Sequence, residues 1–70
     1  MTSKRKVLLQ LSKERKDLLG KIDRLAQFIV KEGPKLSSPL ELTMLNTQLR
    51  SMQAYLESLD ARIIYLRDDQ

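Results

Sequence analysis

The stretch KEGPKLSSPLE, residues 31–41, is unsuited to continuing a helix, and it decides the fold. We expect Gly33 to end a helix in the left-handed conformation, and the proline after it cannot extend that helix. A new helix start follows, with Ser38 as the N-cap, proline at the first helical position and Glu41 three residues after the cap. Because the connection is short, the two flanking segments should fold back on each other.

A stripe of apolar residues, here called the seam, runs along each flanking segment. Its steps alternate between three and four residues, which is typical of helices that pack side by side. Arg15 takes one seam position, opposite Leu56. Its side chain could reach solvent, Asp60 or Glu57, fix the register, or enter a phosphate-holding pocket of an oligomer. The apolar seam residues are Leu8, Leu11, Leu18, Ile22, Leu25, Ile29, Leu42, Leu45, Leu49, Met52, Leu56, Leu59, Ile63 and Leu66.

The numbering of the seam indicates how the helices face each other. In an antiparallel pair the facing residue numbers have a constant sum, and Ile29 with Leu42 and Leu8 with Ile63 both sum to 71. The sequence therefore predicts an all-α fold, a single-domain antiparallel two-helix hairpin. We expect a helix over about 3–31, a turn over about 32–38 and a helix over about 39–67. The pattern leaves open whether the first helix breaks near Ser12.

Further apolar side chains lie away from the seam, and they predict self-association. A chain of 70 residues buries only a modest share of its surface. We therefore expect a homo-oligomeric helical bundle, either a dimeric four-helix bundle or a larger ring of hairpins, with more than two subunits favoured. The residues off the seam are Val7, Leu9, Leu19, Phe28, Val30, Leu40, Met44, Tyr55, Ile64 and Tyr65.

The composition argues against catalysis and against metal or cofactor binding. The chain has neither cysteine nor histidine, so it lacks thiolate ligands, the usual general base and the commonest metal ligand. It also lacks a glycine-rich phosphate loop or a nucleophile paired with a base. Its basic N-terminus is followed by an apolar run too short for a signal peptide, and no apolar run approaches the roughly 20 residues of a membrane span. We expect a cytoplasmic protein that is not an enzyme.

Two places carry the residues expected to bind an anionic ligand. Residues 1–16 hold six lysines and arginines and one glutamate, a net charge of +5. Antiparallel packing should bring this segment beside an aromatic ring and two arginines near the C-terminus, although a frayed charged terminus would look the same. At the turn, a helix start combines with serines and a lysine, although ordinary capping also accounts for them. The candidate ligand-binding residues are Lys4, Arg5, Lys6, Arg62, Tyr65 and Arg67 at the open end and Lys35, Ser37 and Ser38 at the turn.

The second helix also resembles a known family. QLRSMQAYLESLDARI, residues 48–63, is similar to the Q-L-x-x-M-x-x-Y-x-x-x-L-x-x-R-I pattern of short helical proteins from tailed phages, including crAss-like and T-even phages. That group includes the phage anti-CBASS sponges. The resemblance implies a compact homohexamer that sequesters cyclic di- or trinucleotide signals without cleaving them. The sponges carry an additional N-terminal helical segment without a counterpart before Lys4, which favours a larger cyclic ligand at the loop end. The first helix agrees through Glu14, Leu18, Ile22, Leu25, Phe28 and Ile29.

The residues and the resemblance together lead to one principal hypothesis. The chain would be a phage-encoded anti-defence sponge that binds cyclic oligonucleotide signals in the cytoplasm of an infected bacterium, its partners being this ligand and further copies of itself. Two alternatives stay open. One is a helical module that binds linear nucleic acid through its basic end, and the other is a protein-interaction module that docks its extra apolar face on another protein.

Overall fold

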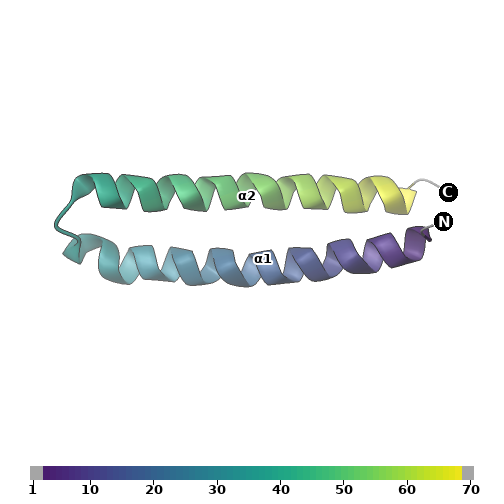
Figure 1. Cartoon of the computed structure of the whole chain (residues 1–70), viewed down its shortest axis with the longest axis horizontal. Helices are drawn as coiled ribbons and strands as arrows, with labels where there is room; N and C mark the ends of the chain where they lie inside the picture. The colour runs from purple at the N-terminus through teal and green to yellow at the C-terminus, as the bar shows by residue number, and fades with distance from the viewer. Residues whose placement is uncertain (1–2, 69–70) are drawn as a thin grey trace.

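Two long antiparallel helices lie side by side in the computed structural model, which describes residues 3–68 (Figure 1). Helix α1 spans Lys4–Glu32, a short 3₁₀ turn (η1) spans Gly33–Lys35, and helix α2 spans Pro39–Asp68. The start of α1 and the end of α2 lie together at the open end, opposite the turn. The molecule is a rod of 52 × 18 × 15 Å. The predicted two-helix hairpin is confirmed.

Helix α1 begins at a serine cap and continues without interruption to the turn. The Ser3 side chain accepts a hydrogen bond of 3.0 Å from the Lys6 backbone N–H. This bond satisfies one of the N–H groups that lack a partner inside the first turn of a helix. The helix passes through Ser12 unbroken, which answers the question that the sequence left open.

The turn does not use the left-handed glycine that the sequence predicts. Gly33 has φ −51° and ψ −48°, which is right-handed helical geometry, and its N–H still bonds to the carbonyl of Ile29. The chain instead tightens into the 3₁₀ turn, where the Leu36 N–H donates to the Gly33 carbonyl at 3.1 Å. Glycine is suited to this position because space is restricted: a Cβ there would lie 3.2 Å from Cδ1 of Leu42. The turn leaves little room for a side chain at this position, because Leu42 would have to shift slightly to admit one.

Helix α2 begins at the predicted cap. The Ser38 side chain accepts a hydrogen bond of 3.4 Å from the Glu41 N–H, and the Ser38 carbonyl accepts one from Leu42. Within residues 3–68 the Glu41 carboxylate makes no return bond to Ser38, so only one half of the expected capping box forms. The serine and the proline after it are sufficient to start the helix.

The hydrophobic core lies toward the open end of the hairpin. Leu11, Leu59 and Ile63 are buried, and Leu59 is completely inaccessible to solvent. Leu8 packs against this cluster together with Val7, Leu18 and Leu66. The cluster therefore joins Leu8 and Leu11 of α1 to Leu59 and Ile63 of α2, as expected for an antiparallel pair. Every other seam residue is half-buried, including Arg15.

Most apolar residues outside the seam remain exposed on the single hairpin. Their exposed fractions reach 76% at Val30 and 69% at Tyr65. Val7 differs because it packs against the core cluster. In the described part of the chain, neither helix combines the length and hydrophobicity needed to cross a membrane. The exposed members are Leu9, Leu19, Phe28, Val30, Leu40, Met44, Tyr55, Ile64 and Tyr65.

Candidate functional site

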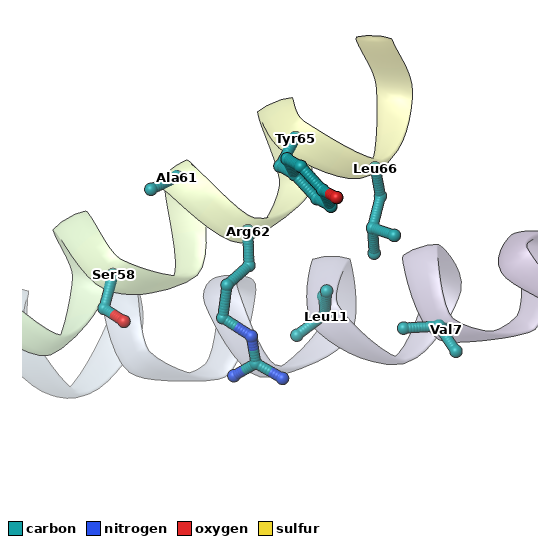
Figure 2. Close-up of a pocket in the computed structure, with 7 residues that line it drawn as sticks. All are labelled: Val7, Leu11, Ser58, Ala61, Arg62, Tyr65 and Leu66. Carbon is teal, nitrogen blue, oxygen red and sulfur yellow. The ribbon is translucent and has the colours of Figure 1, made fainter. Parts of the chain in front are cut away.

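A groove crosses the open end of the hairpin, where the first turns of α1 meet the last turns of α2 (Figure 2). Its volume is about 450 Å³, within the usual range for pockets that bind small molecules. Helix α1 contributes two apolar side chains, and helix α2 contributes small, cationic, aromatic and apolar ones. The lining residues are Val7, Leu11, Ser58, Ala61, Arg62, Tyr65 and Leu66.

The spacing of residues along α2 creates this groove. Residues three or four apart lie on the same side of a helix, so Ser58 and Ala61 lie one turn before Arg62 and Tyr65 respectively. Their small side chains leave open space beside the two large ones. Figure 2 shows the Arg62 side chain extending from α2 toward α1, with the Tyr65 ring on the same part of α2. A cation and an aromatic ring therefore share one opening.

The groove combines three kinds of contact that nucleotides use. The Arg62 guanidinium has several N–H donors in a planar fork that matches a phosphate. The Tyr65 ring offers a face on which a base can stack. Val7 and Leu11 supply apolar surface beneath them. This arrangement suits an anionic ligand that also carries a flat ring.

A polar bond between the helices lies close to the groove. The Tyr55 hydroxyl donates a hydrogen bond to the Glu14 carboxylate. This bond, with burial and the negative charge of Glu14, raises the pKa of Tyr55 above its ordinary value of 10.0, while the positive charge of Arg62 acts in the opposite direction. Arg62 lies two helical turns further along α2, so its field extends along this face of the hairpin.

A second hollow contains the interruption of the seam. Arg15 forms an ion pair with Asp60, which is one of the outcomes that the sequence leaves open. Both side chains remain about two-fifths exposed, at 42% and 39%. The hollow has a volume of about 370 Å³, and Ser12 and Arg67 are among its lining residues. Arg67, expected beside Arg62 and Tyr65, therefore lines a different hollow from theirs.

The remaining predicted binding residues lie outside the groove. Lys4, Arg5 and Lys6 occupy the first turn of α1 at the same end of the hairpin, and all three are exposed. At the opposite end, the Lys35 ammonium lies 3.5 Å from the Glu32 carboxylate, Ser38 caps α2, and Ser37 is exposed. A single hairpin thus separates the candidates into two groups at its two ends. Ligand binding by either group stays a prediction.

Several groove residues were not among the sequence candidates. The sequence pattern places Val7, Leu11 and Leu66 on the apolar surface or the seam, and it gives Ser58 and Ala61 no binding role. The sequence does contain a signal for the groove, because the small residues Ser58 and Ala61 stand four positions before Arg62 and Tyr65. Within residues 3–68, no group of three or more histidine, cysteine, aspartate or glutamate side chains could hold a metal ion.

Comparison with known protein families gives a match over most of the chain. Residues 6–65 match the model of a protein family described as Sequestin. The matched stretch includes the turn, most of both helices and all the groove residues except Leu66. No curated protein and no solved structure matches the chain.

Proposed function

The chain belongs to the Sequestin family, and from this premise we propose that it binds and sequesters a cyclic di- or trinucleotide immune signal without cleaving it. The family name indicates sequestration of a ligand. The resemblance of residues 48–63 to the phage anti-CBASS sponges supports a cyclic oligonucleotide as that ligand. The proposal includes the setting, which is a phage-encoded anti-defence protein in the cytoplasm of an infected bacterium.

The observation that carries the proposal is the joint placement of Arg62 and Tyr65 in one groove. The guanidinium would bind a phosphodiester, and the ring would stack on an adjacent base. No histidine or cysteine is present in the chain to act as base or nucleophile. Binding without turnover is therefore the function that this chemistry supports.

We further propose that several copies assemble into a homo-oligomer, with a hexamer as the state that the resemblance implies. The support is the exposed apolar surface of the hairpin, which a second copy could cover. Leu40, Met44 and Tyr65 are each more than three-fifths exposed, and Ile64 is 58% exposed. Assembly would also enclose a groove that one hairpin leaves open.

Calorimetric titration with a panel of nucleotides tests the ligand. The panel contains cyclic di- and trinucleotides, linear dinucleotides of the same base composition, and cyclic ADP-ribose, which has an adenine and phosphates but is not an oligonucleotide. We expect a cyclic oligonucleotide to bind most tightly and to be recovered intact after heat denaturation of the complex. Native mass spectrometry of the same complex reports the number of chains and of ligands.

Matched variants connect the binding to the groove. Arg62→Gln should weaken binding about 10-fold or more, since a hydrogen bond to a charged group is lost. Arg50→Gln, the same change elsewhere on α2, should leave the affinity unchanged. Failure of the folded protein to bind any cyclic oligonucleotide at micromolar concentration would overturn the proposal. Equal binding of linear RNA, with steep weakening by salt, would instead favour a nucleic-acid-binding module.

A further inference from the structure

The outward side of α1 carries another basic hollow, which is separate from the groove and from the hollow at Arg15. It surrounds Gly20, and its volume is about 410 Å³. The seam residues Leu18 and Ile22 face α2, and Gly20, two residues from each, lies on the opposite side of the helix. The lining residues are Lys16, Asp17, Gly20, Lys21 and Arg24.

Gly20 is unfavourable for the helix, and packing between the helices does not explain it. A glycine in a helix interior costs about 1 kcal/mol relative to alanine. A Cβ built on Gly20 would come within 4 Å of one side chain only, that of Arg24, and Nη1 of that arginine would lie 3.3 Å away. No atom of α2 requires the glycine. Its effect is to leave bare backbone as the floor of the hollow and room for the guanidinium above it.

The cations around this floor are unpaired in the described part of the chain. Among residues 3–68, the side chains of Lys16, Lys21 and Arg24 form no hydrogen bond or ion pair, unlike Arg15, which pairs with Asp60. Three positive charges face the single negative charge of Asp17. Their mutual repulsion would be relieved by an anion placed between them.

We propose that this hollow binds a phosphate-bearing anion. Arg24 donates its fork of N–H groups, Lys16 and Lys21 supply point charges on either side, and the anion lies above the bare backbone at Gly20. A tetrahedral phosphate can accept hydrogen bonds from three directions, whereas a planar carboxylate offers fewer. Because the three cations outnumber Asp17, the lining has a net positive charge, and a multiply charged ligand such as a diphosphate is preferred over a monoanion. The site does not depend on the groove or on the proposed function.

A heteronuclear NMR titration with inorganic pyrophosphate, at constant ionic strength, tests the site. We expect saturable shifts of the backbone amides around Gly20, with little change at Ser58 or Tyr65. Adenosine diphosphate, titrated in parallel, should shift the same amides if the phosphates supply the binding energy. Shifts by the nucleotide without shifts by pyrophosphate would overturn the assignment to phosphate. Absence of saturation for both ligands would overturn the site altogether.

Four variants separate binding from folding. Arg24→Gln should weaken pyrophosphate binding about 10-fold, because a charge-assisted hydrogen bond is lost, whereas Lys31→Gln, the same loss of charge further along α1, should not. Gly20→Ala should weaken binding although it favours the helix, since the methyl group occupies the floor. Unchanged affinity in both Arg24→Gln and Gly20→Ala would contradict the proposal. Arg62→Gln should leave pyrophosphate binding intact, so the two proposals can fail independently.

Discussion

Arg15 of α1 and Asp60 of α2 form an ion pair between the helices at a seam position that is otherwise reserved for apolar side chains. The neighbouring residue, Glu14, accepts a hydrogen bond from Tyr55. Two consecutive residues of α1 thus make polar contacts with α2 near the middle of the hairpin. We expect these directional contacts to favour one axial position of the helices, whereas a uniform apolar seam tolerates sliding.

Replacing Arg15 with leucine should stabilise the hairpin. The pair is about two-fifths exposed, so solvent screens it and its contribution is small. A leucine would complete the apolar seam, and we expect a gain of about 1 kcal/mol in the free energy of unfolding. Urea denaturation followed by circular dichroism, at one fixed protein concentration, measures the change. Lys13→Leu, at an exposed position of the same helix, should change stability by less than about 0.5 kcal/mol.

A loss of stability in Arg15→Leu would show that the polar pair outweighs the apolar seam. In that case Asp60→Asn should produce a similar loss, because it removes the same interaction from the other helix. The two substitutions together therefore distinguish a stabilising pair from one that serves only to fix the register.

The burial of Leu59 in the core leads to a second prediction. Leu59 is completely buried, so Leu59→Ala should lower the free energy of unfolding by about 3 kcal/mol through lost contacts and the cavity left behind. Leu9→Ala makes the same chemical change at a side chain that is 67% exposed, and it should cost less than about 0.5 kcal/mol. Thermal unfolding of both variants provides the comparison. Equal losses would contradict a core centred on Leu59.

The sequence predicts the hairpin well because its signals are local. The alternating steps of the seam and the cap at Ser38 each depend on residues within a few positions of one another. The groove was predicted only in part. Arg62 and Tyr65 are chemically conspicuous, but the space between them depends on Ser58 and Ala61 and on how α1 approaches α2. Arg67 lines a different hollow because it stands two residues after Tyr65, which is a rotation of about 200° around the helix.

The conformation of Gly33 was also mispredicted, for a related reason. Glycine at the end of a helix most often indicates left-handed geometry, which is a local preference of the backbone. Here the constraint on residue 33 comes from the second helix, because Leu42 approaches the position that a side chain would occupy. This contact across the turn favours glycine, and it cannot be recognised from the residues next to Gly33 in the sequence.

Replacing each of the two glycines of the chain with alanine should change the free energy of unfolding in opposite directions. Gly33→Ala would place a methyl group 3.2 Å from Leu42 Cδ1, so we expect a loss of about 1 kcal/mol as that contact is pushed apart. Gly20→Ala should instead stabilise the helix by about 0.5–1 kcal/mol, since only the flexible end of Arg24 must move. Chemical denaturation of both variants gives the two values. A gain in both would mean that the turn relaxes without cost.

The bond between Tyr55 and Glu14 predicts a change at alkaline pH. The pKa of Tyr55 is raised above 10.0 in the folded chain, chiefly because its hydroxyl donates to the Glu14 carboxylate. In the variant Tyr65→Phe, Tyr55 is the only tyrosine, and its ionisation can be followed alone by tyrosinate absorbance. We expect its midpoint to lie above the ordinary value. Adding Glu14→Gln should lower that midpoint, since it replaces the charged acceptor of the hydrogen bond with a neutral side chain.

The sign of the effect on stability follows from linkage. Above the ordinary tyrosine pKa, the unfolded chain releases its proton while the folded chain still holds it, so the folded state binds more protons. The contribution of this bond is therefore complete below about pH 10 and is lost as the pH rises through the folded pKa of Tyr55. Tyr55→Phe should remove this part of the alkaline loss, and denaturation across the alkaline range measures it. An unchanged alkaline profile in Tyr55→Phe would show that the bond makes no contribution in solution.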